Sequence, residues 1–402
     1  MSILRDITRQ ASLYLDTPEI LLFIGPRQAG KTTILRQLKD ILDQRGDVSY
    51  LINLEDSEYL ELLNKSPKNL FKIVSIDLDQ KTTLFIDEIQ YLKNPSNFLK
   101  YLYDEYAGKV KVVASGSSAF YLDEKFKDSM AGRKKIFNVL TLSFPEFLLF
   151  KGEEKLSKSR LGDLSLQDTE KVSGYFREYM VYGGYPRVVL AALSEKEDLL
   201  REIAFSYIKK DVFEARIRND DSFYKLFRIL ANQVGSLTNA AELASTLDVS
   251  KTAIDRYLYV MRLSFHISLV RPFFRNIRKE LTKMPKVYFH DLGLRNFFVG
   301  SFDAFETRDD KGELLENAVF RQLLVKNNAE DINFWRTTQK NEVDFIVNGA
   351  DAFEVKSDVT KFNKKKYVSF LGSYPKINFS LVTIDKKQAD LDGYTVLNAW
   401  EV

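Results

Sequence analysis

The stretch ILLFIGPRQAGKTT, residues 20–33, decides how the first part of the chain folds. Its first five residues are apolar and are typical of a short buried strand. The residues that follow, Gly25–Thr32, match the pattern G-x-x-x-x-G-K-[ST] at every fixed position. Residues 31–42 have helical periodicity, so the motif lies between a strand and a helix. This context predicts a loop whose backbone N–H groups surround a phosphate at a helix N-terminus.

The residue types of this loop suit phosphate binding. The glycines let the backbone turn tightly, and the helix N-terminus adds partial positive charge. Lys31 offers a point charge to β- and γ-phosphates, and the Thr32 hydroxyl is a ligand for Mg²⁺. We therefore expect a nucleotide and Mg²⁺ at this loop, held by Gly25, Gln28, Ala29, Gly30, Lys31, Thr32 and Thr33.

Two further strand ends carry polar residues. Residues 84–88, LFIDE, are an apolar strand that ends in two carboxylates. Asp87 is placed to hold Mg²⁺ through water, and Glu88 to orient and polarise an attacking water as general base. Residues 110–115 are another apolar strand, followed by Gly116 and Ser117. Ser117 either senses the γ-phosphate or lies in a plain turn at the carboxyl edge of the sheet.

Composition excludes several classes of site. The 402 residues contain no cysteine, which excludes a disulfide framework, cysteine-ligated zinc and a cysteine nucleophile. Two histidines are too few for a multi-histidine metal site, and both His266 and His290 are expected to be structural. No apolar run approaches the ~20 residues of a membrane helix, and the charged N-terminus is unlike a signal peptide. We expect a cytoplasmic protein of two or three domains without a membrane segment.

The order of apolar and amphipathic stretches predicts how the chain is organised. Residues 19–150 alternate buried strands with helices, which is typical of a parallel sheet covered on both faces. Residues 151–172 are charged and predict an exposed loop or linker. Residues 173–290 have mostly helical patterns, and residues 310–402 return to alternating helices and strands. The overall fold class is therefore α/β.

Four segments together resemble the AAA+ ATPases that combine an AAA domain with a C-terminal domain of unknown function; they are GPRQAGKTT, LFIDEIQ, ASGSSAF and AGRKKIFNVLTLSFPEF. The resemblance implies a P-loop sheet core with an extra strand between the two nucleotide motifs. It implies ATP as the nucleotide, its hydrolysis, and either a homo-oligomer or a nucleotide-controlled switch. It also makes Arg133 the candidate arginine finger, acting in cis or from a neighbouring subunit. The alternative for Arg133 is a surface arginine in an ion pair.

A helix–turn–helix pattern occupies the middle of the chain. Residues 238–247 and 250–262 predict two short helices, capped by Thr238 and Ser250, and residues 263–289 could supply the strands of a wing. Residues 201–290 carry 16 Lys and Arg against 9 Asp and Glu, which favours contact with DNA. The second helix would offer to DNA the residues Lys251, Thr252, Arg256 and Tyr259. The alternative is a module that docks a protein.

Acidic residues and a lysine near the C-terminus form a second constellation. Asn348-Gly349 predicts a hairpin, and a loop of residues 348–350 sets Asp344 opposite Glu354. Opposed acids repel unless a cation such as Mg²⁺ lies between them. Lys356, on the same face as Glu354, could activate water or stabilise charge on a phosphate.

Asp344 followed by Glu354-x-Lys356, with Glu316 on the preceding helix, resembles the PD-(D/E)xK restriction-endonuclease-like superfamily. This resemblance makes Glu316, Asp344 and Glu354 candidate metal ligands and Lys356 a candidate catalytic residue. The alternatives are a nuclease fold that does not cut, a sheet face held by salt bridges, and a different fold.

These observations predict three parts: an AAA+ domain at 1–172, a helical region with a winged helix at 173–300, and a nuclease-like α/β domain at 301–402. Two functions remain open. One is an ATPase that binds DNA and controls a metal-dependent nuclease. The other is an ATP-dependent switch, binding DNA or a protein, whose nuclease-like domain is inactive. A metal near Asp344 and Glu354 favours the first, and a Lys356 bridge that closes the site favours the second.

Overall fold

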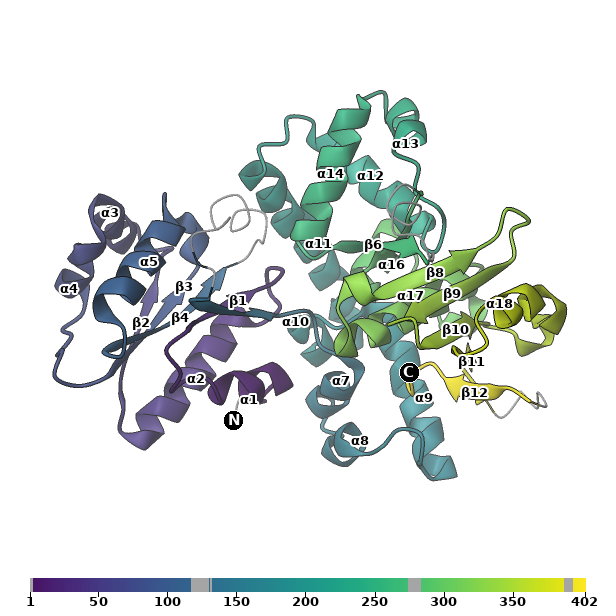
Figure 1. Cartoon of the computed structure of the whole chain (residues 1–402), viewed down its shortest axis with the longest axis horizontal. Helices are drawn as coiled ribbons and strands as arrows, with labels where there is room; N and C mark the ends of the chain where they lie inside the picture. The colour runs from purple at the N-terminus through teal and green to yellow at the C-terminus, as the bar shows by residue number, and fades with distance from the viewer. Residues whose placement is uncertain (1–2, 117–129, 131, 274–282, 387–392) are drawn as a thin grey trace. The chain divides into compact units, whose positions relative to one another are not determined.

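The computed structural model describes residues 3–116, 130, 132–273, 283–386 and 393–402 (Figure 1). The chain forms two compact units. Unit 1 contains residues 1–140 with the short segments Phe213–Arg216 and Leu263–Phe265, and unit 2 contains the rest. Each unit has its own hydrophobic core.

Unit 1 is built on a five-stranded parallel sheet in the order β2-β3-β4-β1-β5. Its strands are β1 (Ile20–Ile24), β2 (Val48–Asn53), β3 (Thr82–Asp87), β4 (Val110–Gly116) and β5 (Lys134–Asn138). Strand β4 lies between β1 and β3, so an additional strand separates the two motif strands, as the resemblance implied. All residues of β1, β3 and β4 are buried, which confirms the prediction of buried strands.

Helices cover both faces of this sheet. Along β1, Ile20, Leu22 and Ile24 point to one face, and Leu21 and Phe23 to the other. The first face packs on α3 (Ser57–Lys65), α4 (Leu70–Ile73) and α5 (Pro95–Tyr106); the second packs on α1 (Asp6–Ser12) and α2 (Lys31–Arg45). The parallel sheet is therefore buried on both sides, and its functional groups are confined to the strand ends.

The first half of unit 2 is helical. Its helices are α7 (Phe144–Phe150), α8 (Glu154–Lys158), α9 (Leu166–Tyr182), α10 (Pro186–Leu190), α11 (Lys196–Glu214, whose last residues belong to unit 1), α12 (Asp220–Asn232), α13 (Ala240–Leu247) and α14 (Lys251–Leu263). Part of the predicted linker at 151–172 is helical, because α8 and the start of α9 lie within it. The helical region and the C-terminal region belong to one compact unit.

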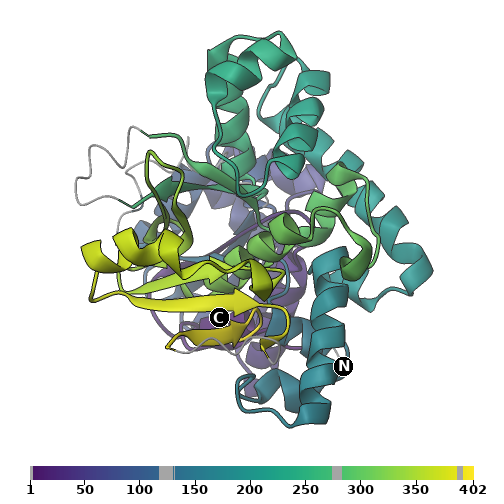
Figure 2. The ribbon, with the colours of Figure 1, turned by 90° about the vertical axis from the view of Figure 1, so that its right-hand side faces the viewer.

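A seven-stranded mixed sheet forms the rest of unit 2, in the order β12-β11-β10-β9-β8-β6-β7. Its strands are β6 (Ile267–Pro272), β7 (Lys286–Phe289), β8 (Ile332–Arg336), β9 (Glu342–Val347), β10 (Asp351–Val355), β11 (Asn378–Thr383) and β12 (Thr395–Asn398). Helices α16 (Leu292–Val299) and α17 (Lys311–Lys326) precede β8, and α18 (Val368–Ser373) precedes β11. The ring of Phe320 on α17 stacks on Tyr288, while Phe370 of α18 packs against Trp335. Figure 2 shows the ribbon of the C-terminal strands of this sheet, in yellow, facing the viewer.

The helix–turn–helix elements form close to their predicted positions. Helices α13 and α14 are joined by a turn in which Asp248 has a left-handed backbone. The cap of α13 is Asn239 rather than the expected Thr238, because the Asn239 side chain accepts from Ala241 N and Glu242 N. Ser250 caps α14 as expected, since its hydroxyl accepts from Ala253 N at 3.1 Å.

After α14, β6 and β7 pair as an antiparallel hairpin. Leu237, which lies between α12 and α13, makes an isolated antiparallel bridge to Lys286 of β7. The helices α12–α14 are thereby tied to the hairpin at a second point. Within the described ranges, no helix combines the length and the apolar character that crossing a membrane requires.

Candidate functional site

The loop between β1 and α2 is shaped by its glycines. At Gly25 a Cβ would lie 2.0 Å from the carbonyl oxygen of Val139, so no larger residue fits. Gly30 caps α2 at φ 97°, and Gln28 also has a positive φ, at 59°. These left-handed positions bend the backbone into a concave turn directly before the N-terminus of α2, where N–H groups converge. The geometry is that of an anion-binding loop.

Lys31 is fixed within this loop. Its side chain is only 4% exposed, and its ammonium group donates to the carbonyl oxygens of Gly25 and Pro26, each at 2.9 Å. Ala29 is buried, and its carbonyl accepts from Arg5 Nη1 at 2.8 Å, whereas Thr33 is exposed on the first turn of α2. The Lys31 ammonium group is thus held inside the loop by the carbonyl oxygens of the loop's first two residues.

Thr32 and Asp87 meet across the sheet edge. The Thr32 hydroxyl donates to Asp87 Oδ2 at 2.6 Å, which joins the phosphate loop to the end of β3. The other carboxylate oxygen of Asp87 accepts from the hydroxyl of Ser115 on β4. A hydroxyl and a buried carboxylate at this distance fit the oxygen ligands that Mg²⁺ prefers. The residues present therefore suit the ion that the sequence motifs imply.

Glu88 follows directly in a strained position. Its φ is 58°, and its backbone N–H donates to Ser115 Oγ at 3.2 Å. Its carboxylate accepts from the side-chain amide of Gln90, which is 3% exposed. Ser115 and Gln90 were not identified from the sequence. The signal for Ser115 was its place at the carboxyl end of the strand inserted beside β3.

Arg133 does not lie near the phosphate loop of its own chain. It precedes β5, which runs parallel to β1 with Lys134 opposite Ile20. The loop leaves the carboxyl end of β1, so Arg133 lies at the opposite edge of the sheet, ~16 Å away for a five-residue strand. Its Nε is 3.1 Å from Asp104 Oδ1. A role in cis is thus not supported, and a role in trans stays a prediction. Ser117 lies outside the described residues.

In unit 2, the hairpin register is the predicted one. Strands β9 and β10 pair Val347 with Asp351 and Phe345 with Phe353, leaving residues 348–350 as the loop. Continuing this register by one residue sets Asp344 opposite Glu354. Both are buried, at 7% and 4% exposure.

An unexpected lysine lies among these acids. The ammonium group of Lys286, on β7, pairs with Glu342 and lies 3.3 Å from Glu316 Oε1 and 3.8 Å from Asp344 Oδ1. The Lys286 side chain is 1% exposed. Burial alone would lower the pKa of Lys286, but the carboxylates of Glu316, Asp344 and Glu342 outweigh it and raise the pKa. Lys286 therefore carries its charge among three acidic side chains.

The remaining acid is also partnered within the chain. Lys356 Nζ pairs with Glu354, whose Oε1 also accepts from the Tyr367 hydroxyl at 2.7 Å. Asp344 Oδ2 accepts from Val355 N at 2.8 Å. Burial, then the charges of Glu354 and Glu316, raises the pKa of Asp344 well above its usual range. Burial also raises the pKa of Glu354.

The predicted metal ligands Glu316, Asp344 and Glu354 are near one another but do not form a ligand set. In the described part of the chain, no group of three or more acidic or histidine side chains is arranged to hold a metal ion. Lys286 stands between Glu316 and Asp344, and Lys356 is engaged by Glu354. The residues present therefore do not fit a divalent ion at this place, which is the arrangement that favours an inactive domain.

Replacing Asp344 with asparagine is expected to stabilise unit 2 above pH 7. A raised native pKa means that the native state favours protonated Asp344, so wild-type stability falls as pH rises above the ordinary carboxyl pKa. Asparagine resembles the protonated acid and can still accept from Val355 N. We expect a gain of ~1 kcal/mol, or ~3 °C in Tm, at pH 8. The gain should shrink toward pH 4.5; a gain independent of pH would contradict the shifted titration.

Three family models match separate parts of the chain. Residues 17–148 match a family described as AAA domain. Residues 173–304 match the domain of unknown function DUF8612, and residues 311–402 match the domain of unknown function DUF4143. The first match contains the phosphate loop, Asp87 and all five strands of the parallel sheet. This part of unit 1 is therefore similar to AAA domains.

Relatives of similar length occur in distant organisms. An uncharacterized protein of Haemophilus influenzae is 26% identical over 411 residues, covering 97% of this chain and 95% of the relative. The uncharacterized protein MJ1544 of Methanocaldococcus jannaschii is 28% identical over 372 residues, covering 90% of this chain and 80% of the relative. These relatives share most of the chain, but their names specify no activity.

Likeness to solved structures is weak. The replication initiator DnaA bound to AMPPCP and single-stranded DNA aligns over 65% of this chain and 90% of its own, at 15% identity and a TM-score of 0.33. The Pif1 helicase from Candida albicans aligns over 45% of this chain and 48% of its own, at 15% identity and a TM-score of 0.27. Scores this low do not establish a common fold over the aligned lengths.

Proposed function

We propose that the AAA-type domain binds and hydrolyses ATP, and that this chain is an ATP-dependent switch that binds DNA. The observation that carries the ATPase part is the contact between Thr32 and Asp87, which joins the phosphate loop to the acidic strand end. Lys31, the residue before Thr32, supplies the ammonium group for the phosphates. Mg²⁺, held by Thr32 and through water by Asp87, would neutralise charge on the β- and γ-phosphates.

Glu88 is the proposed general base. It follows Asp87 directly, and the Gln90 amide and the Ser115 hydroxyl fix its carboxylate and its backbone N–H. In this role Glu88 would accept a proton from the water that attacks the γ-phosphate. The Glu88 carboxylate would then have to give up its hydrogen bond with Gln90 before it accepts this proton.

Replacing Glu88 with glutamine tests this role. Because Glu88 contacts neither Lys31 nor Thr32, ATP binding should stay within about twofold, while phosphate release should fall by ~100-fold or more, within the range for a lost general base. Binding is measured by isothermal titration calorimetry and turnover by phosphate release. Turnover above one tenth of the wild-type rate would remove Glu88 from the mechanism.

Ser115→Ala is expected to have a smaller effect. The hydroxyl orients Asp87 and accepts from Glu88 N, and a lost hydrogen bond of about 1.4 kcal/mol corresponds to a tenfold slower reaction. We expect ~10-fold slower phosphate release with the Tm nearly unchanged, since Asp87 keeps its bond to Thr32. Ser245→Ala, on the exposed surface of α13, is the control. Equal rates in the two variants would show that Ser115 does not position these acids.

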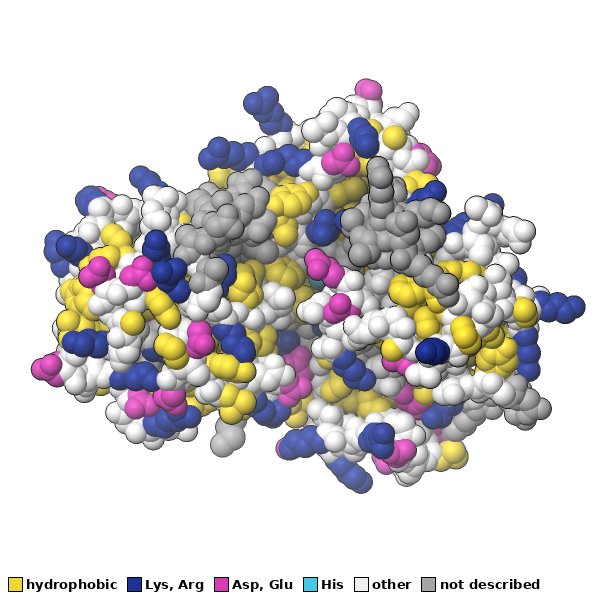
Figure 3. All heavy atoms as spheres, viewed as in Figure 1, with side chains coloured by type: hydrophobic (Ala, Val, Ile, Leu, Met, Phe, Trp, Pro, Cys, Tyr) yellow, Lys and Arg dark blue, Asp and Glu magenta, His cyan; other side chains and the backbone are white. Residues whose placement is uncertain are grey.

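DNA binding is proposed for the α12–α14 region. The helix–turn–helix followed by a β-hairpin has the element order of a winged helix. Lys251, Thr252 and Arg256 are exposed on α14. Figure 3 shows Lys and Arg side chains gathered over the end of unit 2 that carries α11 and α14. Binding of a short duplex by the full chain, followed by fluorescence anisotropy, tests this part.

The C-terminal domain is proposed to be a platform without nuclease activity. What supports this proposal is that ammonium groups of Lys286 and Lys356 neutralise the acids that a metal would need. Incubation with duplex and single-stranded DNA, ATP and Mg²⁺ or Mn²⁺ should give no cleavage above that of Lys356→Ala. Cleavage that is lost in that variant would restore the alternative, a nuclease under nucleotide control.

A further inference from the structure

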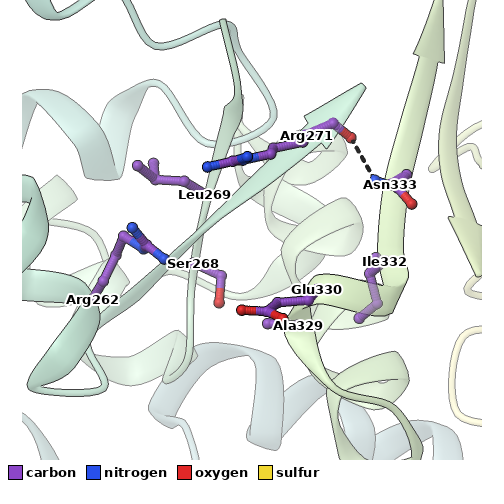
Figure 4. A pocket seen from close by; sticks show the side chains of 8 residues that line it. All are labelled: Arg262, Ser268, Leu269, Arg271, Ala329, Glu330, Ile332 and Asn333. Atoms are coloured by element: carbon purple, nitrogen blue, oxygen red, sulfur yellow. Dashed lines mark hydrogen bonds between the residues drawn. The ribbon is translucent and has the colours of Figure 1, made fainter. Parts of the chain in front are cut away.

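A pocket opens in unit 2 where two strands separate. Strand β6 pairs with β8 only through Arg271 and Pro272, which lie opposite Asn333 and Phe334. Earlier in β6, at Ser268, the two strands are no longer paired, and a cavity of about 360 Å³ lies between them. Figure 4 shows the side chains that line it: Arg262 comes from the end of α14, Ser268 and Arg271 from β6, Glu330 from the turn before β8, and Asn333 from the start of β8.

Two guanidinium groups dominate the chemistry of this pocket. Arg262 and Arg271 are both exposed, and within the described residues neither guanidinium has a carboxylate or hydrogen-bond partner. Other arginines of unit 2 differ: Arg295 and Arg308 both pair with Asp310. The Ser268 hydroxyl is already bonded to His290 Nε2 at 2.7 Å. A ligand would therefore meet the two guanidinium groups first, and these suit phosphate oxygens.

The net charge of the pocket favours a phosphate group that carries a single negative charge. Arg262 and Arg271 contribute two positive charges, and Glu330 contributes one negative charge. The remaining single positive charge matches a phosphodiester, which carries one negative charge. A free phosphate or a nucleoside triphosphate carries more, and the Glu330 carboxylate would repel it.

The pocket continues the exposed face of α14. At 100° per residue, Lys251, Thr252, Arg256 and Arg262 fall within an arc of 140°, and all four are exposed. The opposite side of the helix is buried through Ile254, Tyr257 and Met261. A DNA strand following the exposed face would reach Arg262 at the end of the helix and then Arg271 on β6.

We infer that the pocket formed by Arg262 and Arg271 holds a backbone phosphate of DNA. The inference rests on the proposed function, because it locates one contact of the proposed DNA complex. The contact fixes the position of the strand and carries no information on base sequence. It adds to the α14 residues a second anchoring point, on the hairpin that follows the helix.

The test is the salt dependence of DNA binding by the full-length protein. Anisotropy of a labelled duplex is measured between 50 and 300 mM KCl for wild type and for R262Q/R271Q; each lost phosphate contact lowers the slope of log K against log salt by ~0.9. We expect a slope shallower by ~1 and ~10-fold weaker binding at low salt, equal for unrelated sequences. R262K/R271K, which keeps both charges, should retain most of the slope. R160Q, at an exposed arginine on another part of unit 2, should match wild type.

Other outcomes separate the possible errors. If wild type binds DNA and R262Q/R271Q keeps its slope and affinity, the pocket is not a phosphate site, although the proposed function stands. If wild type binds no DNA, both fail. If inorganic phosphate binds to wild type and not to the double variant while DNA binding is unchanged, the ligand is a free phosphate and the inference is wrong. Circular dichroism before each titration confirms that the surface variants are folded.

Discussion

Replacing Lys31 with alanine is expected to lower ATP turnover by ~100-fold or more and to weaken ATP binding. The ammonium group is a buried positive charge in the loop, and it lies within 2.9 Å of two loop carbonyls. In a site with little water, removing a charge that stabilises the transferring phosphate costs several kcal/mol of the barrier, and 1.4 kcal/mol is already tenfold. Phosphate release under saturating ATP and Mg²⁺ measures the change.

The matched control is Lys39→Ala on the same helix. Lys39 is also a lysine of α2, but it is partly exposed and pairs with Asp43, four residues along the helix. We expect its loss to leave turnover unchanged and to cost only a few tenths of a kcal/mol in stability. If Lys31→Ala and Lys39→Ala keep the same turnover, the loop is not the site of ATP hydrolysis.

Lys286→Met is expected to destabilise unit 2 by ~3–5 kcal/mol, a fall of ~10 °C in Tm. Removing one partner of a buried ion pair leaves the other charge without compensation, and here Glu316 and Glu342 lose a common partner. Methionine has a similar length, so the effect of lost volume is small. Thermal and urea unfolding of the full chain, followed by circular dichroism, measures the loss.

Two comparisons isolate the electrostatic cause. Lys283→Met changes an exposed lysine three residues earlier and should alter stability by no more than ~0.5 kcal/mol. Lowering the pH to 5 should reduce the penalty of Lys286→Met, because the carboxylates left without a partner can then take up protons. A Lys286→Met protein as stable as wild type at pH 7.5 would show that this lysine does not neutralise the acids.

The parts of the two sites that are formed by residues close together in the sequence could be predicted. The glycines and the lysine of residues 25–32 are enough to indicate the phosphate loop. The hairpin loop at 348–350 likewise places Asp344 opposite Glu354 by strand geometry alone. The order of apolar strands and helices likewise predicted a buried parallel sheet, and resemblance supplied the strand between the motif strands.

What could not be predicted depends on residues that only the fold brings together. Lys286 precedes Glu316 by thirty positions and Glu342 by still more, and no spacing pattern links a strand lysine to those acids. Ser115 reaches Asp87 because β4 lies beside β3, which sequence order does not reveal. Arg133 fits its motif locally, but the parallel pairing of β5 with β1 places it at the edge of the sheet away from the loop.

Equilibrium binding of ATP tests the central claim, that Lys31, Thr32 and Asp87 form one nucleotide site. Calorimetric titration of the full chain should show one ATP per chain, bound more tightly with Mg²⁺ than with EDTA. In Thr32→Ala the gain from Mg²⁺ should disappear, since the hydroxyl beside Asp87 is lost. Wild-type protein that binds no ATP at millimolar concentration with Mg²⁺, or binding that Thr32→Ala and Lys31→Ala leave unchanged, would contradict the account.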